Sequence, residues 1–327
     1  MLNTHPYERL NPDRVIAAVE SCGYASDARL LALNSYENRV YQVGIEDAEP
    51  IIAKFYRPER WSDAQILEEH AFSHELVDAD LSVVAPMLDS SGESLHHFEG
   101  FRFALFRRRG GYPPELSNLD NLLVLGRTVG RIHAVGKAAA FAERETLSIE
   151  RMLVQSRALL LDGFIPRDLI AAYESLTKDL IDTVNTLYGE AGVSDLQRVH
   201  GDCHVGNILW RDNTAHFVDL DDCCMAPAIQ DLWMFLSGDR GERQLQLAEL
   251  IAGYDEFSDF DPRQLRWVES LRTMRLMHYA AWLARRWSDP AFPRSFTWFN
   301  TDRYWSDHIL ELREQLSALQ EPPLELF

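Results

Sequence analysis

Two aspartates and an asparagine between residues 200 and 222 have the types and spacing that phosphoryl transfer requires. Asp202 is followed five positions later by Asn207, and a short apolar run then ends at Asp219. That interval is the Asp-to-Asn spacing of the catalytic loop in phosphoryl-transferring enzymes. Because Mg²⁺ is a hard cation that prefers oxygen ligands, a carboxamide and a carboxylate suit it. We therefore predict Asn207 and Asp219 as metal ligands, Asp202 and Asp219 as the catalytic carboxylates, and Asp202 as the base for an acceptor hydroxyl.

The motifs around these residues resemble those of a known kinase family. His200-Gly201-Asp202 replaces the His-Arg-Asp of ordinary protein kinases, and Asp219-Leu220-Asp221 replaces their Asp-Phe-Gly, as in the aminoglycoside and choline kinase branch of the protein-kinase-like fold. Further similarity lies in NSYENRVYQV (34–43), IIAKFYRPERW (51–61), QILEEHAF (65–72) and DLWM (231–234). Together these segments are similar to the bacterial stress response kinase A family over almost the whole chain.

This resemblance implies an ATP- and Mg²⁺-dependent kinase that phosphorylates Ser or Thr hydroxyls of proteins in a stress response. The same branch of the fold contains kinases of antibiotics, choline and sugars, so a small-molecule hydroxyl is the alternative acceptor. A catalytically silent nucleotide-binding scaffold is a rival of another class. It is disfavoured because the chain has Lys54 together with Asp202, Asn207 and Asp219, and a scaffold needs no base.

Lys54 is predicted to contact the α- and β-phosphates of ATP. It lies in the apolar segment 51–55, where a lysine alone would be an ordinary strand residue, but the downstream motifs favour the nucleotide role. Its partner is expected on the following helix, where Glu68 and Glu69 are both available. We choose Glu69 because it lies seven residues before Leu76, as in similar family members.

The loop expected to cover the phosphates, residues 34–39, contains no glycine. The backbone amides of a tight turn can still bind phosphate. The Ser35 hydroxyl and the Asn38 amide are predicted as additional donors to the nucleotide. An ordinary polar hairpin turn is the alternative interpretation.

Other polar residues near the motifs are predicted to have structural roles. His200 and Asp231 are expected to hold the catalytic loop, because a buried aspartate near the start of a helix accepts backbone amides. His133 is expected to brace the core or a loop rather than to act as a base. Six arginines lie within residues 263–286, and for them salt bridges to the acidic surface are favoured over a site for an anionic substrate.

The four cysteines are too few and too unevenly placed for a disulfide framework. Cys203-His204 and Cys223-Cys224 are adjacent pairs, whereas structural zinc sites usually separate their paired ligands. A zinc-binding interaction module is therefore the weakest alternative. Since Cys203 lies beside the predicted base, its oxidation is a hypothetical route to inactivation.

The composition excludes several kinds of partner. The 51 Asp and Glu residues against 32 Lys and Arg give a net charge of −19, which disfavours nucleic acids and anionic membranes. The N-terminal sequence MLNTHPYERLNPD has no apolar run after a basic segment, and no other stretch approaches the length of a membrane span. We expect a cytoplasmic monomer whose partners are ATP and an acceptor.

The predicted site residues must be positioned by an α+β, two-lobe, protein-kinase-like fold. We expect an N-lobe (1–106) that binds the nucleotide phosphates, and a hinge at RRRGGYPP leading into a mostly helical C-lobe (107–327). The N-lobe is predicted to contain a first helix that starts at Asn11 and Pro12, antiparallel strands at 29–33, 39–44, 50–56 and 101–106, and a helix at 62–77. Helices of the C-lobe are predicted at 118–141, 167–188, 228–236, 243–257, 262–287 and 302–319. The catalytic stretch is expected as two short strands between helices.

Overall fold

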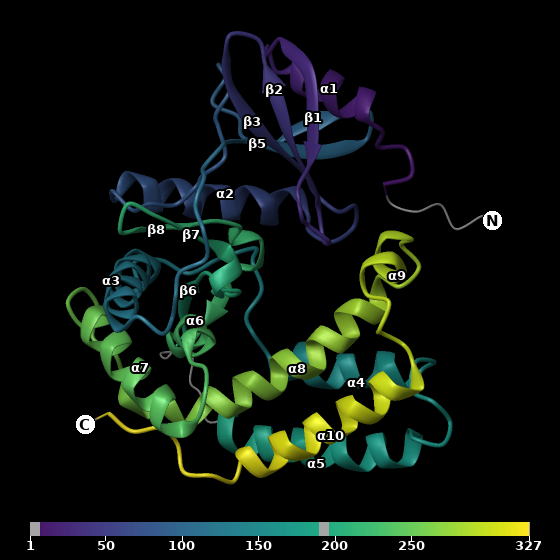
Figure 1. The fold of residues 1–327 in the computed structure, drawn as a ribbon, viewed down its shortest axis with the longest axis vertical. Coiled ribbons are helices and arrows are strands. Elements are labelled where there is room, and N and C mark those ends of the chain that lie inside the picture. The colour runs from purple at the N-terminus through teal and green to yellow at the C-terminus, as the bar shows by residue number, and fades with distance from the viewer. Residues whose placement is uncertain (1–6, 190–195, 327) are drawn as a thin grey trace.

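The N-lobe is built on a five-stranded antiparallel sheet in the order β1-β2-β3-β5-β4 (Figure 1). The computed structural model describes residues 7–189 and 196–326. The strands are β1 (Ser26–Ala32), β2 (Arg39–Ile45), β3 (Ala48–Phe55), β4 (His96–Phe98) and β5 (Phe101–Arg107). β3 is central and carries Lys54, which is paired in register with Val40 of β2 and Ala104 of β5. The sheet therefore fixes the position of this lysine from both sides.

Two helices flank the sheet. α1 (Pro12–Ser21) begins where the Asn11 side chain accepts the backbone amide of Arg14 at 2.9 Å, and it buries Val15, Ala18 and Val19 in the N-lobe core. α2 (Asp63–Asp78) begins with a reciprocal capping box between Ser62 and Gln65. In Figure 1, α2 runs beneath the sheet, and its Phe72 and Leu76 belong to the hydrophobic core of the C-lobe. Its Ile66 belongs to a small cluster with Tyr56 and Ala104 of the N-lobe, so the helix packs against both lobes.

The C-lobe is mostly helical. Its α-helices are α3 (Leu119–Gly136), α4 (Gln155–Leu161), α5 (Ile170–Tyr188), α6 (Ile229–Leu232), α7 (Arg240–Tyr254), α8 (Val268–Arg285), α9 (Ala291–Ser295) and α10 (Asp302–Ala318). Two small antiparallel pairs accompany the catalytic stretch: β6 (Gln197–Val199) and β9 (Cys224–Ala226) border it, and β7 (Ile208–Arg211) and β8 (Thr214–Phe217) are the two short strands within it. Across residues 7–189 and 196–326, no helix combines the length and apolar content needed to cross a membrane.

The predicted α+β, two-lobe architecture is confirmed, and several element boundaries differ. The helix predicted over 118–141 ends at Gly136, and the chain beyond it is bound to α2, where the Glu68 carboxylate accepts the backbone amides of residues 142, 143 and 144 at 2.6, 2.8 and 2.6 Å. The helix predicted over 228–236 is α6 followed by a 3₁₀ turn at Trp233–Phe235. The three-residue strands β4, β6 and β9 were too short to show a period. The predicted lobe boundary at residue 106 falls within β5, one residue before the end of that strand.

Two helical segments were not predicted, α9 (Ala291–Ser295) and the segment that precedes and includes α4. Residues Glu150–Val154 form a π-helix that continues directly into α4. The wider π turn shifts the hydrophobic register, so an α-helical period does not run through the segment. Arg151 and Met152 of this turn line the cavity between the lobes.

Two carboxylates join the lobes on the side of α8 and α9. Glu37, in the loop between β1 and β2, accepts a hydrogen bond from Arg286 of the C-lobe at 2.8 Å. Asp289, whose side chain is 2% exposed, pairs with Arg39 at 3.0 Å and with Arg57 at 2.9 Å. Figure 1 shows α9 next to the lower end of the β1–β2 hairpin. We call these ion pairs of Glu37 and Asp289 the interlobe clasp.

Candidate active site

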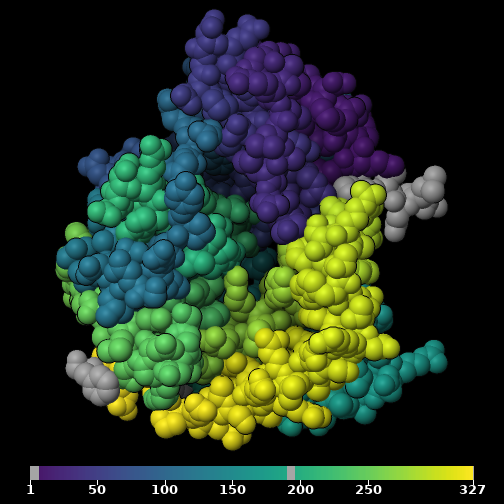
Figure 2. Space-filling model, viewed as in Figure 1, coloured from purple at the N-terminus to yellow at the C-terminus, as the bar shows by residue number. Residues whose placement is uncertain are grey.

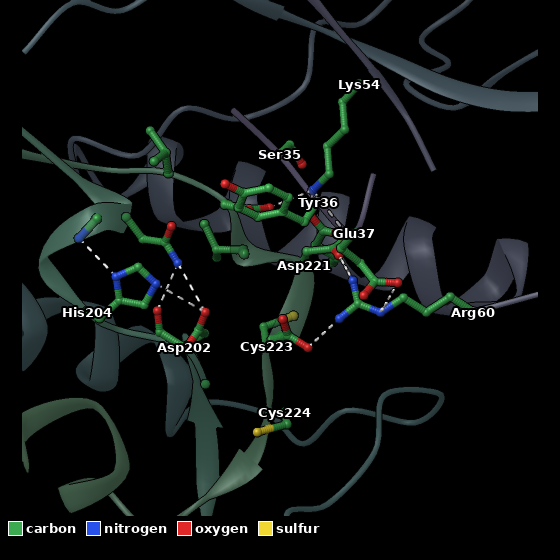
Figure 3. Close-up of a pocket in the computed structure, with 18 of the residues that line it drawn as sticks. Ser35, Tyr36, Glu37, Lys54, Arg60, Asp202, His204, Asp221, Cys223 and Cys224 are labelled. Atoms are coloured by element: carbon green, nitrogen blue, oxygen red, sulfur yellow. Dashed lines mark hydrogen bonds and ion pairs between the residues drawn. The ribbon is translucent and has the colours of Figure 1, made fainter. Parts of the chain in front are cut away.

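A cavity of about 990 Å³ lies between the two lobes. Figure 2 shows the hollow below the purple N-lobe, bordered by the green and yellow helices of the C-lobe. Six of the seven predicted site residues line it: Ser35, Lys54, Glu69, Asp202, Asn207 and Asp219. In Figure 3, Lys54 reaches into the cavity from above, with Asp202 and His204 at one end and Arg60 at the other. The structure thus brings together residues that are up to 184 positions apart.

Lys54 is surrounded by carboxylates. Its Nζ lies 2.7 Å from Asp219 Oδ1, 3.2 Å from Asp221 Oδ1 and 4.0 Å from Glu69 Oε1. Burial alone would lower the pKa of Lys54, but Asp219, Asp221 and Glu69 outweigh burial and hold the pKa well above its ordinary value. The lysine is therefore a fixed positive charge within the cavity.

The two glutamates that the sequence offered as partners face different ways. Glu69 is buried beside Lys54, and burial raises the pKa of its carboxyl to about 7, against the opposing charge of Lys54. Glu68 instead accepts the backbone amides of residues 142–144, in the loop after α3. The structure therefore places Glu69, the predicted partner, on the lysine side of α2.

The two loop residues predicted to contact the nucleotide also differ in position. Ser35 lines the cavity, whereas Asn38 is 2% exposed and lies behind the lining. Asn38 Nδ2 donates to Asp221 Oδ2 at 3.1 Å, and its Oδ1 accepts the backbone amide of Arg57 at 3.0 Å. Because both ends of the carboxamide are engaged within the protein, this position favours a bracing role for Asn38 over the predicted phosphate contact.

Asp221 lies buried at the centre of the polar contacts that link Lys54, Asn38 and Arg60. No role was predicted for Asp221 from the sequence. Its side chain is 3% exposed and contacts Lys54, Asn38 and Arg60, while Arg144 donates to its backbone oxygen. Burial alone would raise the pKa of Asp221, but Arg60 and Lys54 hold it well below its ordinary value. The sequence did contain a signal for this role, since Asp221 stands at the position where the Asp-Phe-Gly motif has glycine.

Asp202, the predicted base, is engaged at both carboxylate oxygens. Arg275 of α8 forms an ion pair with Oδ1, and His204 Nε2 lies 3.4 Å from Oδ2. Burial alone would raise the pKa of Asp202, but the hydrogen bond from His204 and the charge of Arg275 hold it below its ordinary value. The carboxylate is therefore ionised near neutral pH, as a proton acceptor must be.

Asn207 and Asp219 present oxygen atoms that fit a hard cation. Asn207 Nδ2 donates to the backbone oxygen of Asp202 at 2.9 Å, and its Oδ1 has no hydrogen bond to another described residue. Asp219 has a left-handed backbone, with φ of +60°, and its side chain is 47% exposed. A carboxamide oxygen and an accessible carboxylate are the donor types that Mg²⁺ prefers.

The zinc alternative finds no support in this arrangement. Within the described residues, no group of three or more His, Cys, Asp or Glu side chains is arranged to hold a metal ion. Cys203, Cys223 and Cys224 are buried as free thiols. Burial raises the pKa of the Cys203 thiol well above its ordinary value, which disfavours the reactive thiolate. The hypothesis of inactivation through oxidation of Cys203 is therefore not supported.

A buried carboxylate holds the catalytic loop from below. Asp231 accepts the backbone amides of His200 at 2.7 Å and Gly201 at 2.9 Å, and His133 Nε2 lies 3.0 Å from the same carboxylate. His200 Nε2 lies 3.0 Å from the backbone oxygen of Val218, next to Asp219. These contacts are the bracing roles expected for Asp231, His200 and His133 from the sequence.

Gly201→Ala is expected to lower the free energy of unfolding by about 2–5 kcal/mol. Gly201 has φ of +85°, and a Cβ there would lie 2.1 Å from the backbone oxygen of Asp222. The left-handed conformation costs roughly 1–2 kcal/mol for a residue with a Cβ, and steric overlap adds roughly 1–3 kcal/mol. The same contact explains why glycine stands where other kinases have arginine.

Chemical denaturation measures this difference, and Gly23→Ala is the matched control. Gly23 has φ of +90°, and a Cβ there would have no atom within 4 Å. Gly23→Ala therefore isolates the backbone cost from the overlap. Equal destabilisation by the two substitutions would contradict the proposed overlap with Asp222.

The sequence of this chain is similar to those of known phosphotransferases and kinases. Residues 29–268 match the phosphotransferase enzyme family. Stress response kinase A of Escherichia coli (strain K12) is 45% identical over 321 residues, which covers 98% of this chain and 97% of that protein. A protein of Salmonella typhimurium (strain LT2) named serine/threonine protein kinase RdoA is 43% identical over 325 residues, covering 99% and 98%.

Solved structures show where the same fold occurs. An amicoumacin kinase, hAmiN, in complex with AMP-PNP, Ca²⁺ and Ami superposes with a TM-score of 0.73 at 19% identity and covers 96% of both chains. A microcompartment-associated aminopropanol kinase superposes with a TM-score of 0.69 at 18% identity, covering 93% of this chain and 96% of that one. At these identities the likeness shows the fold alone.

Proposed function

This chain belongs to the phosphotransferase enzyme family and, within it, to the stress response kinase A family, and on that premise we propose that it transfers the γ-phosphoryl group of ATP to Ser or Thr hydroxyls of proteins in a stress response. The observation that carries the proposal is the convergence of Lys54, Asp202, Asn207 and Asp219 on one cavity between the lobes. An ATP-dependent reaction also favours the cytoplasm as its location, because ATP is available there.

Each residue has a separate task in this reaction. Lys54, as a fixed positive charge, binds the α- and β-phosphates, and the Ser35 hydroxyl donates to phosphate from the covering loop. Asn207 and Asp219 hold Mg²⁺ through their oxygen atoms, and Mg²⁺ when bound supplies charge neutralisation at the phosphates. The present contact of Lys54 with Asp219 at 2.7 Å keeps the phosphate and metal positions adjacent. Glu69 orients Lys54 from the α2 side.

Asp202 accepts the proton of the attacking hydroxyl. Its carboxylate is ionised and lies at the end of the cavity opposite Arg60 (Figure 3). Arg275 and His204 each engage one oxygen of Asp202, and each oxygen keeps a second lone pair that can accept the hydrogen of a hydroxyl. The acceptor hydroxyl therefore shares the Asp202 carboxylate with Arg275 and His204.

A small-molecule hydroxyl is the second candidate acceptor. It is favoured by the shared fold, because the two solved structures named above are an amicoumacin kinase and an aminopropanol kinase. The protein acceptor is favoured by the relatives at 43–45% identity, one of which is named a serine/threonine protein kinase. The higher identity and nearly complete coverage make the protein acceptor the first choice.

Transfer from labelled ATP to a cell extract distinguishes the two acceptors. The protein is incubated with γ-labelled ATP, Mg²⁺ and an extract from which small metabolites have been removed, and the Asp202→Asn variant corrects for kinases already in the extract. We expect label in other polypeptides. Label that appears only after metabolites are restored, in compounds of low mass, would support the small-molecule acceptor and contradict the proposal.

A further inference from the structure

One face of α8 forms a wall of the cavity, and no step of the proposed reaction uses most of it. Leu271, Arg275, His278, Tyr279, Trp282 and Arg285 all line the cavity. Their spacing of three to four residues is that of a single helical face. Because Arg275 contacts Asp202, this face begins at the predicted base and leads away from it. It therefore lies where an acceptor would lie.

The arginines along this wall are not equally neutralised. Three carboxylates of the cavity are each paired with an arginine: Glu37 with Arg286, Glu145 with Arg151, and Asp222 with Arg60. Arg285 lines the same cavity, is exposed, and has no hydrogen bond or ion pair with another residue of the described ranges. Arg285 is therefore a positive charge on this wall that no carboxylate of the described residues pairs with.

Other charged side chains lie near Arg285. Partial burial lowers the pKa of Arg285, the charges of Arg286 and Arg151 lower it further, and the charge of Glu37 raises it. A cation in the last turn of α8 also complements the helix dipole, but that role does not require a side chain in the cavity. In a chain with a net charge of −19, a local positive charge inside a cleft attracts anions specifically to that cleft.

The distance along α8 sets where an acidic group would bind. Arg275 and Arg285 are ten residues apart, and a helix rises about 1.5 Å per residue, so their positions differ by about 15 Å along the axis. An extended peptide covers about 3.3 Å per residue. A peptide that lies along this wall with its hydroxyl at Asp202 would present to Arg285 a side chain about four or five residues away.

We propose that Arg285 is a specificity-determining residue that binds an acidic side chain of the acceptor about four or five residues from the phosphorylated Ser or Thr. This inference rests on the proposed function. Arg275 marks the hydroxyl end of the same wall, where it positions Asp202. An acceptor with an amine at the position that contacts Arg285 would be repelled by the like charge of Arg285, and is therefore disfavoured.

Peptide substrates with a single charged residue at varied positions test the proposal. The starting peptide is uncharged and contains a single Ser. In one set of peptides, one Glu is placed in turn at each position up to six residues before or after the Ser. A second set has Lys at the same positions. We expect Glu to raise kcat/KM about tenfold over Lys at one position about four or five residues from Ser, as a charge-assisted hydrogen bond would. Arg285→Glu is expected to prefer Lys at that position, and Arg285→Lys to keep the preference for Glu.

Arg303→Glu is the control for net charge. Arg303 lies on α10, its side chain is 92% exposed and it does not line the cavity, so this variant is expected to keep the parental profile. A flat Glu and Lys profile, or a preference that Arg285→Glu leaves unchanged, would overturn the role of Arg285 while transfer to peptides still supports the proposed function. No transfer to any peptide would overturn the proposed function, and the inference with it.

Discussion

Asp202→Asn is expected to lower kcat by about 10²- to 10⁴-fold with almost no change in the affinity for ATP. A positioned base typically contributes this much to rate, and an amide cannot accept the proton of the acceptor hydroxyl. The loop should remain folded because Asn207 donates to the backbone oxygen of Asp202 at 2.9 Å, and the substitution does not remove that oxygen. Arg275, which loses its ion pair, has a side chain that is 41% exposed and can be solvated.

Steady-state transfer and ATP titration on the same preparations measure this separation of binding from chemistry. Asp212→Asn is the matched control, because Asp212 lies in the β7–β8 turn with an 89% exposed side chain and outside the cavity lining. The control is expected to keep parental turnover. Parental turnover in Asp202→Asn would contradict the role of Asp202 as base. A loss of turnover would also argue against a silent nucleotide-binding scaffold, which has no turnover to lose.

Asp219→Ala is expected to abolish transfer and to remove the Mg²⁺-dependent part of the ATP affinity. Asp219 is the accessible carboxylate of the two proposed metal ligands, so its loss leaves only the carboxamide of Asn207. Lys54 keeps Asp221 at 3.2 Å, so the lysine stays charged and in place. Alanine at φ of +60° costs roughly 1 kcal/mol of stability, which is too little to unfold the protein.

Calorimetry with and without Mg²⁺ distinguishes Asp219 from Lys54. Lys54→Ala is expected to weaken ATP binding even when Mg²⁺ is saturating, since the lysine contacts the phosphates directly. Asp219→Ala is expected to bind ATP equally with and without Mg²⁺. The proposed metal position would be wrong if Asp219→Ala bound Mg·ATP and turned over like the parent.

The sequence was sufficient for the architecture and for the residues whose tasks are local. The spacing from Asp202 to Asn207 and the lysine in the apolar strand are properties of short segments, and family resemblance connected the segments. The helix periods and the strand patterns then predicted two lobes. Long helices such as α5 and α10 were predicted at nearly their observed positions, whereas the first six residues of the helix predicted over 262–287 form a separate 3₁₀ helix before α8.

The parts that the sequence could not provide depend on tertiary contacts. A polar loop residue such as Asn38 can face a ligand or a buried carboxylate, and only the packing of Asp221 beneath the loop decides between them. The favoured interpretation of the arginines as surface salt bridges fits Arg263, which pairs with Asp261 at 2.6 Å. It does not fit Arg275, because a helical period does not reveal that one face of α8 meets Asp202, 73 positions earlier in the chain.

The interlobe clasp has a consequence for how this protein can be recombined with its relatives. Across the lobe boundary, Glu37 pairs with Arg286, and Asp289 pairs with Arg39 and Arg57, so each of these ion pairs takes its two charges from different lobes. A chimera joined near residue 107 would carry half of each pair from a different parent. Exchange of residues 34–57 together with 282–289 keeps the partners from one parent. In evolution, as in an engineered chimera, these two segments would therefore be exchanged together, although more than 220 residues separate them in the sequence.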